Sequence, residues 1–158
     1  MDAKKELIKH LKAAIELENQ GIDKYREFAQ SSKSHYARLL FERLIKEEES
    51  HVAFFGMMLM QLEKNKALDR ARAEQALKEI DHTEVFETGK SGISENYISA
   101  LVYVVDVEER TMNYYSELAD STEDEVTREI FQNMARYEKK HYDTFKTELE
   151  YAKNVPHT

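Results

Sequence analysis

The chain has 158 residues, a formal net charge of −8, one proline and no cysteine. This length allows one domain with a substantial core and leaves no room for two large ones. Without cysteine, a disulfide framework, thiol catalysis and a cysteine-ligated zinc or iron site are excluded. The negative charge disfavours non-specific nucleic-acid binding, which requires a positive surface, and would attract metal cations.

The N-terminal stretch MDAKKELIKHLKAAIELE is charged and amphipathic, and it lacks the apolar core of a signal peptide. No segment approaches the roughly 20 apolar residues that a membrane-spanning helix requires. We therefore expect a cytoplasmic protein that has neither a membrane nor a nucleic acid as its partner.

Four helical segments follow one another along the chain. The first begins near residue 3 and places apolar side chains three and four positions apart, as one buried helical face does. The same spacing recurs from about Ser34 to Lys64, from about Ser94 onwards, and in a fourth segment that ends near residue 153. The short polar stretches QSSKS and DSTEDE separate these segments in pairs and supply groups that cap helix starts. They predict two antiparallel helical hairpins, at about 3–64 and 94–153.

The connection between the predicted hairpins, residues 65–93, is long enough to cross a bundle from end to end. We expect a short helix in it, before the sequence TGKSG. The predicted fold is all-α: one domain over residues 1–158, built as a four-helix bundle of two antiparallel hairpins joined by a long crossover connection.

The two hairpins repeat one another at a distance of ninety positions. FERLIKEEESHVAFF (41–55) and FQNMARYEKKHYDTF (131–145) share one frame of Phe, Glu, His and Phe. When residues 8–59 are aligned with 98–149 without a gap, thirteen pairs are identical. Several are core positions that any amphipathic repeat would share. Three pairs instead place titratable residues on the apolar stripe: Glu18/Glu108, Glu48/Glu138 and His51/His141.

These carboxylates lie where a buried face is predicted. Glu18 follows Leu11 by seven residues and precedes Tyr25 by seven, so the three side chains share one face. Burying an unpaired carboxylate costs several kcal/mol, and four together would repel one another. Because no Lys or Arg lies within one turn on these faces, bound metal ions are the simplest source of compensating charge.

The ligand types fit this interpretation. Four carboxylates and two imidazoles form the mixed oxygen and nitrogen set that suits iron or manganese. A Glu from each of two helices, with Glu-x-x-His from each of the other two, is the ligand pattern of ferritin-like di-iron and di-manganese bundles. The sequence therefore predicts a ferritin-like bundle with two iron ions, manganese being the alternative. The predicted ligands are Glu18, Glu48, His51, Glu108, Glu138 and His141. The competing interpretation is a satisfied polar core without metal.

Other polar residues near this stripe have simpler expected roles. The glutamates that flank the predicted ligands turn away from the stripe and are expected on the solvated surface: Glu16, Glu47, Glu49 and Glu109. Tyr25 and Tyr115 lie on the stripe, two turns from a predicted ligand, and a buried Tyr hydroxyl needs a partner. We predict that each supports the site by bonding a ligand carboxylate from another helix; packing alone is the alternative.

The chain resembles the rubrerythrin branch of the ferritin-like superfamily over nearly its whole length. ENQGIDKYREFA (18–29) and EEESHVAFF (47–55) are similar to the first two helices of that family. EERTMNYYSELA (108–119) and YEKKHYDTF (137–145) are similar to its last two. The resemblance implies peroxide reduction or ferrous-iron oxidation, and usually a homodimer. It also implies that Glu18 and Glu108 are terminal ligands and that Glu48 and Glu138 are bridging ligands. His51 and His141 would then bind one iron each.

The chain departs from the rubrerythrin pattern in two places. Full rubrerythrins carry a cysteine-ligated rubredoxin iron site, which this chain cannot form. They also carry a further Glu one turn after the ligand of the third helix, where this chain has Thr111, and the repeat mate of Thr111 is Gly21. These small side chains would leave room for water or a small oxidant beside the metals.

Three functional hypotheses follow. The first is a di-iron oxidoreductase that reacts with hydrogen peroxide or dioxygen and takes electrons from a separate donor protein. The second is oxidation and handling of ferrous iron. The third is a helical interaction module with a relict metal site. Hydrocarbon oxygenation ranks below these because the sequence shows no substrate cavity.

Overall fold

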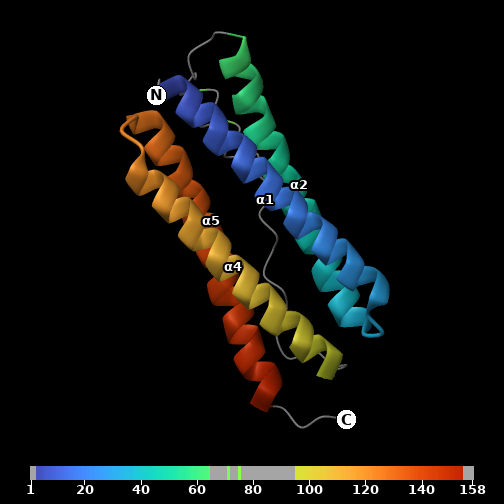
Figure 1. Cartoon of the computed structure of the whole chain (residues 1–158). Coiled ribbons are helices and arrows are strands. Elements are labelled where there is room, and N and C mark those ends of the chain that lie inside the picture. The colour runs from blue at the N-terminus through green and yellow to red at the C-terminus, as the bar shows by residue number, and fades with distance from the viewer. Residues whose placement is uncertain (1–2, 65–70, 72–74, 76–94, 155–158) are drawn as a thin grey trace.

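The computed structural model describes residues 3–64, 71, 75 and 95–154, and it consists of long helices (Figure 1). They are α1 (Ala3–Ser31), α2 (His35–Glu63), α4 (Glu95–Ser121) and α5 (Glu125–Asn154). The prediction of an all-α four-helix bundle is confirmed. The short helix predicted before TGKSG lies outside the described residues. None of the described helices is long and apolar enough to cross a membrane.

Matching caps set the start of the second helix in each hairpin. The side chain of Ser34 accepts a hydrogen bond from the backbone N–H of Ala37, at 3.3 Å, where α2 begins. At the start of α5, the carboxylate of Asp124 accepts from the backbone N–H of Thr127 at 2.9 Å and from its hydroxyl at 2.6 Å. Such caps satisfy backbone donors that the first turn of a helix leaves unpaired. Ser34 and Asp124 are ninety positions apart, so the repeat extends to the turns.

Helix α1 packs along α2, and α4 packs along α5, which gives the two predicted hairpins (Figure 1). All four helices contribute to each of two apolar clusters. One cluster includes Leu11, Phe55, Tyr115 and Phe131, and the other includes Tyr25, Phe41, Leu101 and Phe145. The apolar core is therefore divided along the length of the bundle.

The division of the core also shows how the hairpins are connected. Near its end, α2 places Leu62 in the first cluster, whereas α4 places Tyr97, near its start, in the second. The end of α2 and the start of α4 therefore lie towards opposite ends of the bundle, as the predicted crossover connection requires.

Candidate metal centre

The layer between the two apolar clusters contains all six predicted ligands. Each has at most 9% of its surface exposed, and every helix contributes at least one. They form two groups of potential ligand atoms that lie within 4.8 Å of one another. The first group is Glu18, Glu48, His51 and Glu138, and the second is Glu108, Glu138 and His141. Glu138 belongs to both groups, so it lies at the centre of the site.

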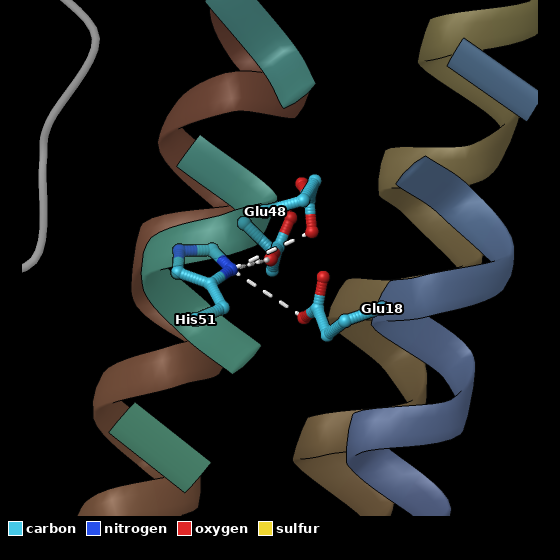
Figure 2. Close-up of side chains that lie close together, drawn as sticks. Glu18, Glu48 and His51 are labelled. Carbon is cyan, nitrogen blue, oxygen red and sulfur yellow. Dashed lines mark ion pairs between the residues drawn. The ribbon is translucent and has the colours of Figure 1, made fainter. Parts of the chain in front are cut away.

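In the first group, three carboxylates surround one imidazole nitrogen. Nδ1 of His51 lies 3.4 Å from Oε1 of Glu18, 3.6 Å from Oε2 of Glu48 and 3.3 Å from Oε1 of Glu138. Figure 2 shows Glu18 reaching from α1 towards Glu48 and His51 on α2. Glu48 and His51 share this face because they lie three residues apart on one helix.

The second group repeats this geometry on the other hairpin. Nδ1 of His141 lies 3.7 Å from Oε2 of Glu108 and 3.8 Å from Oε2 of Glu138. Both imidazoles therefore turn Nδ1 towards the shared carboxylate of Glu138, which has one oxygen facing each histidine.

Several buried polar atoms of the site have no hydrogen-bond partner among the described residues. They include Nδ1 of both histidines, both carboxylate oxygens of Glu108 and of Glu138, and Nε2 of His51. Leaving such atoms unpaired costs roughly 1–3 kcal/mol each, so native proteins rarely do so. Divalent cations would supply partners for the Nδ1 and carboxylate atoms, and these oxygen and nitrogen donors fit iron or manganese.

The carboxylates of the site compete for protons. Burial raises the pKa of Glu18, although His51 opposes the effect. Burial and the charge of Glu138 raise the pKa of Glu108 well above its ordinary value. Burial would raise the pKa of Glu138 too, but interactions with Glu108 and the two histidines outweigh it, and the pKa is lowered. Glu138 therefore keeps its charge while Glu108 tends to hold a proton.

The histidines shift in the opposite sense from ordinary buried imidazoles. Burial lowers the pKa of His51, but Glu18 and Glu138 more than offset this, and the pKa rises well above its usual value. The pKa of His141 rises in the same way, because Glu108 and Glu138 outweigh burial. Without metal, protons provide the positive charge that the carboxylates need, and bound cations would replace them.

The two tyrosines near the site are fully buried but differ in their contacts. The hydroxyl of Tyr115, on α4, donates a hydrogen bond to the carboxylate of Glu18 on α1, which is the predicted contact. The hydroxyl of Tyr25 has no partner among the described residues, so the matching contact predicted for Tyr25 is not present.

One flanking glutamate was placed wrongly by the sequence pattern. Glu16, Glu49 and Glu109 are exposed as expected, but Glu47 is only 1% exposed. Its Oε1 lies 2.5 Å from Nε2 of His141. The signal that could have placed it is the seven-residue spacing of Leu40, Glu47, Phe54 and Gln61, all of which are buried on α2.

With this geometry established, comparison with protein families gives a clear result. The family model described as Rubrerythrin matches residues 9–149. The chain belongs to the rubrerythrin family. The match includes all six predicted ligands. Comparison with curated protein sequences found no match, and comparison with solved structures found none.

This rubrerythrin-family chain has a pocket beside Thr111, the position at which the rubrerythrin pattern described above has a further Glu. The pocket measures about 750 Å³, lies between α1 and α4, and is lined by Gly21 and Thr111 among others. Its lining also includes Glu18, Glu48 and Tyr25, so the pocket reaches the ligand layer. Gly21 leaves open space, because a Cβ built there meets no other atom within 4 Å. The space predicted beside Gly21 and Thr111 is therefore present.

Proposed function

We propose that this chain is a di-iron oxidoreductase whose reduced site reacts with hydrogen peroxide or dioxygen. The main support is the pair of buried ligand groups that share Glu138 and contain unpaired donor atoms. Membership of the rubrerythrin family supports the same class of activity. The metal is proposed to be iron; the donor set also suits manganese.

The six residues would take three ligand roles. Glu18 and Glu108 would be terminal ligands, while His51 and His141 would each bind one ion through Nδ1. Glu138 faces both histidines, which supports a bridging role. Glu48 is proposed as the second bridge on the basis of the repeat. The four ligand carboxylates, with one formal negative charge each, would balance two divalent cations.

Other residues of the chain would serve the reaction around the site. Two ferrous ions bound there would supply the two electrons that, with two protons, reduce one hydrogen peroxide to two waters. The pocket beside Gly21 and Thr111 would admit the oxidant, and Tyr115 would hold Glu18 in place. Because the chain has no cysteine, it cannot form a rubredoxin site, and a separate donor protein would return the electrons.

Metal content and turnover test this proposal. Protein from iron-supplied cells should contain two iron ions per chain. Glu138→Ala should lose both, since Glu138 belongs to both groups, and Glu48→Ala should also lose both if Glu48 is the second bridge. Glu49→Gln, which alters an exposed residue of the same helix, is the control. A well-folded wild type that binds no iron after anaerobic Fe(II) addition would rule out the enzyme.

The competing functions give different kinetics. An oxidoreductase should consume peroxide over many turnovers when a reductant is present. An iron-handling protein should instead consume Fe(II) stoichiometrically and retain the ferric product. An interaction module with a relict site should bind metal without either reaction. A homodimer and a cytoplasmic location remain predictions, and light scattering of the purified chain tests the first.

A further inference from the structure

The buried carboxylate of Glu47 lies behind one of the proposed ligands. Its Oε1 is 2.5 Å from Nε2 of His141, while Nδ1 of the same ring faces Glu108 and Glu138. The two nitrogens of an imidazole point away from each other. Glu47 therefore cannot share a metal ion with Nδ1 of His141, and it belongs to neither group of potential ligand atoms.

The other histidine has no such support. Nε2 of His51 is buried and has no hydrogen-bond partner among the described residues. The repeat mate of Glu47 is Tyr137, a phenol in place of a carboxylate. The two halves of the site match in their ligands and differ in what stands behind the histidines.

We propose that Glu47 is a positioning residue that accepts a hydrogen bond from Nε2–H of His141 and makes the two metal positions unequal. A carboxylate behind a ligating histidine fixes the tautomer and the ring orientation, and it makes the other nitrogen a stronger donor. The position at His141 therefore binds a divalent cation more tightly than the position at His51 and fills first. The inference rests on the proposed metal site and adds an order of loading to it.

Anaerobic titration of the metal-free full chain with Co(II) tests whether the two metal positions differ in affinity. Calorimetry and the visible absorption of the bound ion monitor the titration. The wild type should show two steps of different affinity. Loss of such a carboxylate typically costs 10–100-fold in metal affinity. Glu47→Gln and Glu47→Ala should therefore weaken the tighter step by about 10–100-fold and leave the weaker step within about twofold. Circular dichroism establishes that each variant is folded.

Glu49→Gln is the matched control, because Glu49 lies two residues away, is exposed, and contacts Arg26 at 3.5 Å. It should leave both steps unchanged. Proton NMR of the Co(II)-loaded protein provides a readout that a merely structural role would not alter. The Nε2–H signal of His141 should exchange slowly with solvent in the wild type and faster in Glu47→Ala, while that of His51 stays the same.

Three results would overturn the inference: equal affinities in the wild type, unchanged titrations in both Glu47 variants, or equal weakening of both steps. Each of these leaves two bound ions in the wild type and therefore leaves the proposed function standing. Failure of both the wild type and Glu49→Gln to bind Co(II) would instead overturn the metal site itself.

Discussion

Tyr25 and Tyr115 occupy matching positions in the two hairpins and are equally buried, but only Tyr115 has a hydrogen-bond partner among the described residues. Substitution of these two tyrosines by phenylalanine should therefore change the free energy of unfolding of the metal-free protein in opposite directions. Tyr115→Phe removes the bond to Glu18 and should lower the free energy of unfolding by about 1 kcal/mol. Tyr25→Phe removes an unpaired hydroxyl and should raise it by about 1 kcal/mol. Urea denaturation with a chelator measures both, and changes of the same sign would contradict the assignment.

Glu148 is a buried acid outside the metal centre. The hydroxyl of Tyr97 donates to Oε1 of Glu148 at 2.9 Å, while Oε2 has no hydrogen-bond partner among the described residues. Burial raises the pKa of Glu148 above 4.5, against the opposing effect of Tyr97. The folded state thus favours the protonated acid. The stability that this preference contributes is fully present below pH 4.5, the ordinary pKa of a glutamic acid. It is lost as the pH rises through the pKa of Glu148 in the folded state.

Glu148→Gln should remove this pH dependence, because the amide still accepts from Tyr97 but cannot ionise. The free energy of unfolding of the variant, relative to wild type, should rise from pH 4 to pH 8. Urea denaturation across this range measures the difference, and exposed Glu150→Gln serves as the control. A constant difference between wild type and Glu148→Gln would show that Glu148 does not titrate differently in the folded protein.

The sequence predicted which six side chains gather at the candidate metal centre better than it predicted their surroundings. Glu18 and its counterparts stood out because a repeated carboxylate on an apolar stripe needs compensating charge. Glu47 did not stand out because the helical face was taken as narrower than it is, and a glutamate between Lys46 and Glu48 resembles part of a solvated charge run. The missing contact of Tyr25 depends on side-chain positions that spacing alone does not specify.

The helices themselves were predictable because local signals agree. Breakers are scarce, with one proline and four glycines in the chain, and the capping residues Ser34 and Asp124 stand directly before α2 and α5. The pocket between α1 and α4 was only partly predictable. Gly21 and Thr111 indicated missing bulk, but the volume depends on how the two helices are spaced.

The pocket gives a test at the level of these helices. Gly21→Leu should fill part of it, since Gly21 faces open space, and should lower kcat/KM for peroxide by about tenfold or more, a barrier increase of about 1.4 kcal/mol. Stability should rise by about 0.5–1 kcal/mol, because glycine is unfavourable within a helix. Stopped-flow kinetics of reduced protein and urea denaturation measure the two effects.

Gly56→Leu is the matched control for the pocket. Gly56 also faces open space but lies on α2 and does not line the pocket. It should give the same gain in stability with unchanged peroxide kinetics. If Gly21→Leu reacts as fast as Gly56→Leu, the oxidant does not approach through this pocket.

Across the whole bundle, the ligand layer separates two apolar clusters to which all four helices contribute. Buried carboxylates in the middle of a core are costly without compensation, so bound cations should stabilise the bundle most at this layer. The sequence predicted that six titratable side chains would gather in this layer. It could not predict that Glu138 joins both groups, because that depends on how the second hairpin is seated against the first.

Metal binding should therefore raise the free energy of unfolding of the whole bundle. A ligand at one hundred times its Kd stabilises the folded state by about 2.7 kcal/mol per site, or about 5 kcal/mol for two. For a domain of this size, that corresponds to a rise in Tm of roughly 10–20 °C. Differential scanning calorimetry with and without Mn(II) measures it while avoiding oxygen chemistry. Glu138→Ala should lose most of the rise, because one residue serves both groups, and exposed Glu49→Gln should keep it. An equal rise in both variants would place the stabilising ions elsewhere on this acidic chain.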